Sequence, residues 1–177
     1  MKAQTFKGFF VQRSVFCFFL FLLPTFAFAA GWEPYVNGRF GYAMEIPPGF
    51  SLSNEADNGD GRTYANGGAT LAVWGHYLAA GPFELDVADR RATYKQEGWD
   101  LSYDRQKAGW ASLSGTRGDR ILYHRTIRLC DDAVASFVLE YPVSMKAEIS
   151  PFVGKLVKSL HPAEGCTTAQ GAAPAAQ

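Results

Sequence analysis

A histidine and a glutamate on neighbouring apolar runs are the residues whose types could support acid–base chemistry. His124 lies in the run Ile121–Leu129, and Glu140 lies in the run Ala133–Tyr141 that follows it. If the two runs pair as a hairpin, His124 lies opposite Val138 and diagonal to Glu140, so that the carboxylate could tune the imidazole as a general base. The alternative, which we favour, is a half-exposed strand histidine on the more polar side, without a catalytic role. A periplasmic hydrolase using His124 with a nearby carboxylate is therefore one hypothesis for function.

Other signatures of catalysis do not occur in the chain. Ser114 precedes a glycine, but the residues around it do not form the G-x-S-x-G turn that exposes a nucleophilic serine. The three histidines, His76, His124 and His161, show neither an H-x-H nor an H-x-x-x-H spacing. We therefore expect no cofactor, and a histidine metal site would have to be assembled entirely by the fold.

The segment Asp57-Asn58-Gly59-Asp60-Gly61 is the most conspicuous polar cluster. Asp57 and Asp60 offer the hard oxygen ligands that Ca²⁺ prefers, which makes a calcium-stabilised structural domain a second hypothesis. The segment does not follow the EF-hand pattern, because Gly59 occupies a ligand position and no glutamate stands at the twelfth position. A tight turn, in which Asn, Asp and Gly satisfy backbone geometry, is the interpretation that we favour.

An arginine and two tryptophans are the candidate binding residues. Arg125 falls on the apolar side of its strand, between Tyr123 and Ile127, where a guanidinium must be paired, stacked on a ring or placed at a cleft. We favour structural pairing, with anion binding as the alternative. Trp74 and Trp110 belong to an aromatic-rich chain whose exposed rings could contact a sugar or a protein, or could simply pack in the core.

The first 29 residues are organised as an export signal. Three basic residues precede an apolar run from 15 to 28, and Ala27-Phe28-Ala29 supplies the small residues that a signal peptidase requires. The apolar run, at about 14 residues, is short of the ~20 that span a bilayer. We expect cleavage before Ala30 or Gly31, no stable transmembrane anchor afterwards, and a location in the periplasm or outside the cell.

The charge balance argues against one class of partner. The chain carries 17 basic and 17 acidic side chains, and the signal holds three of the basic ones and none of the acidic ones, so the mature chain is near −3. Without a cluster of Lys and Arg, we do not expect nucleic-acid binding.

Export gives a meaning to the two cysteines of the mature chain. In an oxidising compartment an even number of cysteines favours a disulfide, here between Cys130 and Cys166. Such a bond closes a loop of about 36 residues, for which chain-entropy models give roughly 3–4 kcal/mol. A metal or redox role is less favoured, because no C-x-x-C pattern is present.

Periodicity and turn residues predict alternating hairpins with two helices. Asn66-Gly67-Gly68 separates two strand-like runs and predicts a hairpin. A helix is expected from Pro82 to Gly98, with an apolar stripe made of Phe83, Val87, Tyr94, Leu85, Ala88 and Ala92. A second is expected after Ser150 as N-cap. Strands are expected at about 35–52 (two short ones), 62–64, 69–77, 101–106, 110–116, 120–129 and 133–141.

The register of the last hairpin follows from pattern alone. Apart from Arg125, the odd-numbered positions are apolar in both 121–129 and 133–141. Pairing odd with odd positions requires a three-residue loop, Cys130-Asp131-Asp132. The fold class is thus α+β, with a single antiparallel sheet of about 6–8 strands covered by two main helices. We expect a signal peptide at 1–29, one domain at 30–162, and a mostly disordered tail at 163–177.

Several short segments resemble one group of proteins. They are Trp32-Glu33-Pro34-Tyr35-Val36-Asn37, Arg39-Phe40-Gly41-Tyr42, Ile46-Pro47, Asp57-Asn58-Gly59-Asp60-Gly61, Ser114-Gly115, Glu140-Tyr141-Pro142 and Val157-Lys158-Ser159-Leu160. Together they resemble small exported bacterial proteins of unknown function with a PsbP-like fold, over about residues 32–160. The resemblance implies a non-enzymatic binding or accessory module with a protein or cell-envelope partner, and it brings no catalytic residues. This module is our principal expectation, with the hydrolase and the calcium-stabilised domain as alternatives.

Overall fold

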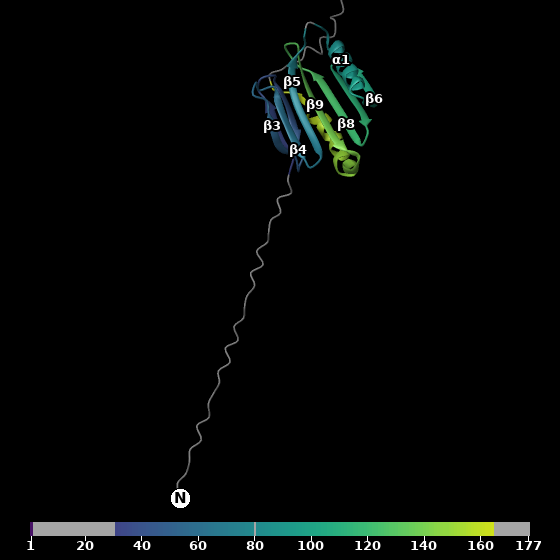
Figure 1. Cartoon of the computed structure of the whole chain (residues 1–177). Helices are drawn as coiled ribbons and strands as arrows, with labels where there is room; N and C mark the ends of the chain where they lie inside the picture. The colour runs from purple at the N-terminus through teal and green to yellow at the C-terminus, as the bar shows by residue number, and fades with distance from the viewer. Residues whose placement is uncertain (2–30, 80, 165–177) are drawn as a thin grey trace, which may run out of the picture.

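A large antiparallel sheet organises the structure. The computed structural model describes Met1 and residues 31–79 and 81–164, so that all but Met1 of the expected signal and most of the expected tail lie outside the described residues. The seven strands lie in the order β3-β4-β5-β9-β8-β7-β6 (Figure 1). Their bounds, in that order, are Ser51–Glu55, Gly61–Asn66, Ala69–Tyr77, Ala133–Pro142, Arg120–Arg128, Trp110–Arg117 and Asp100–Lys107.

A second, three-stranded sheet has the order β1-β2-β10. Its strands are Glu33–Asn37, Tyr42–Ile46 and His161–Pro162. The α+β class is confirmed, but the expectation of a single sheet is wrong. The hairpin β1–β2 buries Tyr35, Tyr42 and Met44. These side chains pack with those of the large sheet in one hydrophobic core, so the hairpin covers a face of the large sheet instead of extending its edge.

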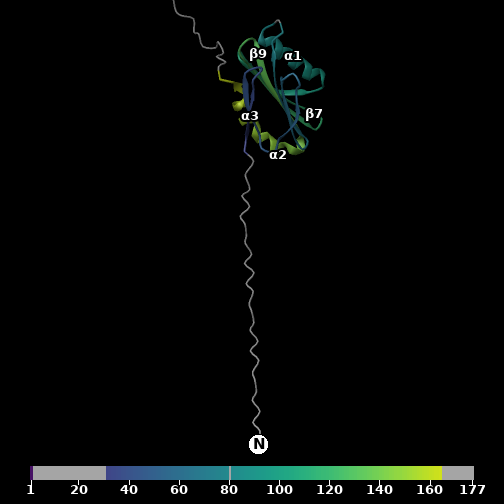
Figure 2. The same cartoon turned by 90° about the vertical axis from the view of Figure 1, so that its left-hand side faces the viewer.

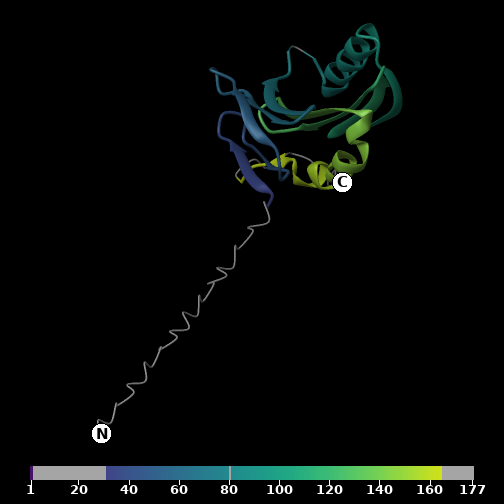
Figure 3. The ribbon, with the colours of Figure 1, turned by 60° about the horizontal axis from the view of Figure 1, so that its bottom comes forward.

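The helices lie on opposite sides of the large sheet. Helix α1, Phe83–Gln96, covers one face, whereas the small sheet and the C-terminal helical segment cover part of the other (Figure 2). Figure 3 shows the same layers with α1 above the sheet and the C-terminal helices below it. The described residues contain no helix that is both long and apolar enough to cross a membrane.

Helix α1 confirms only part of its predicted apolar stripe. Phe83, Val87 and Tyr94 are buried against the sheet, as expected. Leu85, in contrast, is 51% exposed. Only a narrow stripe of the helix, made of Phe83, Val87 and Tyr94, therefore packs on the sheet.

The C-terminal helical segment begins earlier than the sequence indicated. It runs through η1 (Val143–Met145), α2 (Lys146–Ile149), η2 (Ser150–Phe152) and α3 (Val153–Ser159). The prediction of Ser150 as an N-cap is wrong, because its φ of −55° and ψ of −34° are helical. Pro142, with an extended ψ of 149°, precedes the first turn instead.

The predicted register of the β8–β9 hairpin is confirmed. Ile127 pairs with Ala135, and the amide of Leu129 donates to the carbonyl of Ala133 at 2.8 Å, which leaves residues 130–132 as the loop. Asp131 and Asp132 adopt positive φ angles of 54° and 53° to close it. Odd-numbered side chains of both strands therefore face the main core. Because α1 covers the other face, the even-numbered side chains near it are buried too.

Candidate functional site

His124 lies beneath helix α1 and not on a half-exposed surface. It is only 3% exposed, which corrects the expectation of a half-exposed strand histidine. Its Nδ1 lies 3.1 Å from the hydroxyl of Tyr94, and the two rings meet edge to face. Burial lowers the pKa of His124 to about 3, so the imidazole is neutral near pH 7. Val87, Leu113 and the neighbouring side chains enclose it.

Glu140 is held by a different partner. Its carboxylate accepts a hydrogen bond from Nε of Arg120 at 2.9 Å within an ion pair. The register places His124 opposite Val138, as predicted, but the structure gives His124 and Glu140 separate partners and no mutual hydrogen bond. His124 and Glu140 therefore do not form the candidate catalytic pair.

The strand serines are also engaged in structural contacts. Ser114 donates to the carbonyl of Leu122 at 2.8 Å, and Ser136 donates to the hydroxyl of Thr126 at 2.9 Å. Among the hydrogen bonds of the described residues, neither serine bonds to a histidine.

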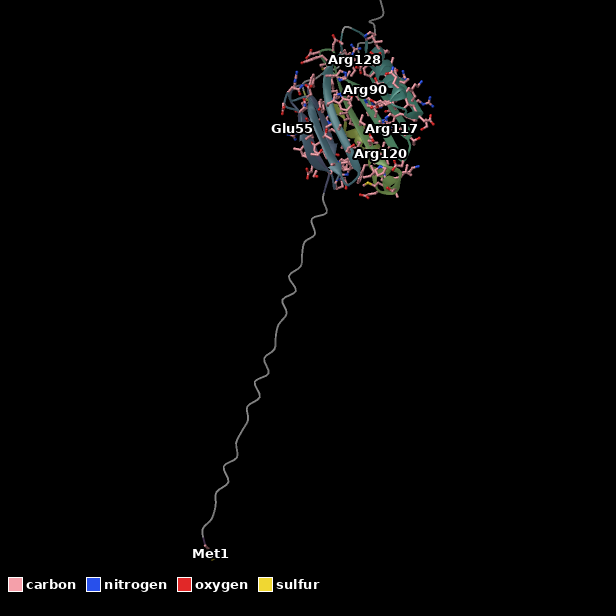
Figure 4. The ribbon with its side chains drawn as sticks, in the orientation of Figure 1. Met1, Glu55, Arg90, Arg117, Arg120 and Arg128 are labelled. Carbon is pink, nitrogen blue, oxygen red and sulfur yellow. The ribbon has the colours of Figure 1, made fainter. Side chains whose placement is uncertain are left out.

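Sequence reasoning did not find the hydrogen bond that attaches α1 to the end of β5. His76 Nε2 lies 2.8 Å from an oxygen of Asp86, and this hydrogen bond holds the pKa of Asp86 below its usual value. One turn further, the guanidinium of Arg90 lies over the rings of Trp74 and Tyr94, at 5.7 and 5.9 Å from their centroids. Trp74 therefore packs at the α1 interface, partly covered by Arg90 (labelled in Figure 4).

The Asp57–Gly61 segment forms a turn held by an arginine. Asp60 is paired with Arg39 at 2.8 Å, and the amide of Asn58 donates to the other Asp60 oxygen at 2.6 Å. Asn37 donates from its side chain to the carbonyl of Gly59 at 2.9 Å. Among the described residues, no group of three or more His, Cys, Asp and Glu side chains is arranged to hold a metal ion. Asp57 is exposed and remains the only other carboxylate in the segment.

Cys130 begins the β8–β9 loop. It lines a surface pocket of about 360 Å³ together with Tyr77 and Arg39. Cys166 lies outside the described residues, so the Cys130–Cys166 disulfide stays a prediction.

A larger groove lies on the small sheet. It measures about 520 Å³ and lies between the hairpin β1–β2 and helix α3. Val36 is 61% exposed there. The ammonium group of Lys155 lies 2.6 Å from a carboxylate oxygen of Glu45, so its charge is already neutralised. The groove is thus lined by apolar side chains, by the Lys155–Glu45 pair and by Lys158.

The most distinctive surface lies on β6, β7 and β8, on the face of the large sheet opposite α1. Strand pairing places its residues in three rows: Tyr103 with Ser114 and Tyr123, Arg105 with Ser112 and Arg125, and Lys107 with Trp110 and Ile127. We call the set Tyr103, Arg105, Lys107, Trp110, Ser112, Tyr123 and Arg125 the arginine–aromatic face. Tyr103 is 42% exposed, and Arg105 and Lys107 are also exposed.

Arg125 is the central residue of this face. Its guanidinium carbon lies 4.2 Å from the centroid of the Trp110 ring, and Nη1 donates to the hydroxyl of Ser112 at 3.0 Å. Its Nε is buried without a hydrogen-bond partner, and burial lowers the pKa of Arg125. Stacking on a ring is one of the arrangements that the sequence allowed for this guanidinium, and within the described chain no carboxylate pairs with it.

The other two arginines of β8, in contrast to Arg125, have carboxylate partners. Arg120 pairs with Glu140, and Arg128 pairs with Asp132 (both arginines are labelled in Figure 4). On β6 the carboxylate of Asp104 points to the α1 side, where it pairs with Arg91. The rows of the arginine–aromatic face therefore contain three cations and no carboxylate. This arrangement suits the binding of an acidic or aromatic partner and includes no nucleophile–base pair.

Comparison with known proteins gives a likeness of fold. The solution structure of cyanobacterial PsbP (CyanoP) from Synechocystis sp. PCC 6803 superposes with a TM-score of 0.55 over 75% of this chain and 93% of that one, at 12% sequence identity. The fold is PsbP-like. No protein-family model and no curated protein sequence matches this chain. At this identity the likeness concerns the fold alone.

Proposed function

We propose that the protein is an exported, non-enzymatic binding or accessory module that contacts a protein or envelope partner through the arginine–aromatic face. One observation carries the proposal: Arg125 is half-buried against Trp110 with no carboxylate partner in the described chain. A desolvated guanidinium without a counter-charge is unfavourable in the isolated protein. A partner that supplies hydrogen-bond acceptors would offset this cost.

The composition of the face supports the same proposal. Tryptophan, tyrosine and arginine are the residues that most often dominate the binding energy of interfaces, since they bury large areas and fix hydrogen-bond geometry. Tyr103, Trp110 and Tyr123 lie on three adjacent strands of a rigid sheet, so their positions require little ordering on binding.

The surroundings of His124 give no support to the hydrolase hypothesis. A general base needs access to a substrate and a pKa near the working pH. His124 is 3% exposed with a pKa lowered to about 3, and its Nδ1 is occupied by Tyr94. A structural role, locating α1 on the sheet, accounts for these contacts.

The proposal is tested by the retention of envelope components on the immobilised mature protein. Arg125→Gln removes the central charge of the face, and Lys95→Gln removes an exposed charge on α1 as a matched control. We expect the components retained by the wild-type protein to be retained equally by Lys95→Gln and to be lost with Arg125→Gln. Equal retention by all three proteins, with unchanged melting curves, would contradict the proposal.

A further inference from the structure

We infer that the partner of the arginine–aromatic face is a protein with an acidic surface; this inference rests on the proposed function and names the chemistry of the partner. Arg105 and Lys107 of β6 and Arg125 of β8 contribute three positive charges to the same face, on either side of β7. The mature chain as a whole is acidic, so this concentration of positive charge is local. A surface of opposite charge is its complement.

The shape and composition of the face favour a protein over a small ligand. Small ligands are bound in concave pockets. The pocket beside Cys130 and the groove on the small sheet both lie on other parts of the described surface. On the arginine–aromatic face, rings and guanidinium groups instead lie in rows across three strands. Enrichment in aromatic residues and arginine is typical of protein interfaces.

The residues of the face differ in burial, and this separates their roles. Arg125 is half-buried and stacked, so it belongs to the centre of the contact, where loss of an anchor accelerates dissociation. Arg105 and Lys107 are exposed, so they belong to the rim, where charge mainly accelerates association and is screened by salt. If the partner is acidic, variants of Arg125 should therefore change mainly the dissociation rate, and variants of Arg105 or Lys107 mainly the association rate.

A soluble random copolymer of glutamate and tyrosine is a suitable probe, because it supplies carboxylates and rings on a polypeptide. Binding to the mature protein is followed through the indole N–H resonance of Trp110. Three comparison probes each share one property with this copolymer. A lysine–tyrosine copolymer has rings on a polypeptide, polygalacturonate carries carboxylates on a glycan, and vesicles containing phosphatidylglycerol carry negative charge on a lipid surface. We expect the Trp110 resonance to shift with the glutamate–tyrosine copolymer and not with the other three.

The variants sharpen this test. Arg125→Gln is expected to weaken copolymer binding about tenfold or more, mainly through faster dissociation. Lys107→Gln is expected to slow association and to reduce the effect of raising ionic strength from about 0.01 M to 0.15 M, which shortens the Debye length from about 30 Å to 8 Å. Arg125→Lys keeps the charge but loses the planar fork, and it separates charge from geometry.

The outcomes distinguish the two proposals. Stronger binding of polygalacturonate or of the vesicles would overturn the inference of a protein partner, and binding of the lysine copolymer would overturn the inference of acidity. If the copolymer does not bind but envelope components are still retained in an Arg125-dependent manner, the inference fails and the proposed function stands. If neither the copolymer nor any envelope component depends on Arg125, both fail.

Discussion

The guanidinium of Arg125 lies over the indole of Trp110, 4.2 Å from the ring centroid, and the described chain provides no carboxylate to neutralise it. Its neighbours on β8 behave differently, since Arg120 and Arg128 each have an acidic partner. A cation that is partly desolvated and uncompensated contributes little to folding, and this makes it a candidate for a role in binding.

Replacement of Arg125 by methionine should separate stability from binding. Methionine retains the packing against Trp110 and removes the buried charge and the unpartnered Nε. We expect the free energy of unfolding to stay within about 1 kcal/mol of the wild-type value or to rise, while partner binding is lost. Thermal and urea denaturation measure the first effect. A large loss of stability would mean that Arg125 is primarily structural.

The protein should lose stability on mild acidification through His124. The pKa of this histidine is about 3 in the folded chain and near 6.5 when unfolded. Below about pH 6.5 the unfolded state therefore binds a proton that the folded state does not, so stability is present above that pH and is lost as the pH falls toward 3. The contribution has a slope of up to about 1.4 kcal/mol per pH unit.

The variant His124→Gln isolates this contribution, because glutamine can still bond to Tyr94 but does not titrate. Between pH 6.5 and about 4.5, carboxylates with a lowered pKa such as Asp86 remain ionised. Urea midpoints measured in this window should fall for the wild-type protein and stay nearly constant for the variant. Parallel curves would contradict the burial of His124.

Calcium should leave the melting temperature unchanged. The carboxylate of Asp60 is paired with Arg39 and bonded by Asn58, so the Asp57–Gly61 segment is closed without a metal ion. Differential scanning calorimetry in millimolar Ca²⁺ and in chelator tests this expectation, and a rise with Ca²⁺ that chelator reverses would contradict it. Arg39→Ala should lower stability by about 1 kcal/mol, as expected for an exposed pair that also anchors a loop.

The predicted export and disulfide can be checked by mass. We expect the protein recovered from the cell envelope to begin at Ala30 or Gly31 and to gain about two mass units on reduction, because each disulfide takes up two hydrogens. Intact mass before and after reduction, with alkylation, measures both. Equal masses would mean that Cys130 and Cys166 are not joined to each other.

Local pattern predicted the strands and the hairpin register well, since period-two alternation in 121–129 and 133–141 fixes which side chains share a face. It did not predict what covers each face. His124 was assigned to a half-exposed side because the sequence alone does not show that α1 packs there. The early start of the C-terminal helical segment is not evident from the sequence, because Pro142, which precedes its first turn, has no side chain that can cap it.

The candidate site was predicted only in part. The position of Arg125 among apolar residues indicated a stacked or paired guanidinium, and stacking is found. Its neighbours Arg105 and Tyr103 come from an edge strand with a bulge between Leu101 and Tyr103, and such a shift in register is not visible in the sequence. The pair of His76 and Asp86 depends on the angle at which α1 crosses the sheet, which no local pattern specifies.

Site-specific photo-crosslinking in the living cell tests the central claim most directly. A benzophenone amino acid is placed at Tyr103, which is 42% exposed on the arginine–aromatic face, or at Leu85, which is 51% exposed on α1. We expect a defined crosslinked protein from position 103, none from position 85, and loss of the product when Arg125→Gln is added. Equal crosslinking from both positions, or a product from 103 that survives Arg125→Gln, would contradict the assignment of this face as the binding surface.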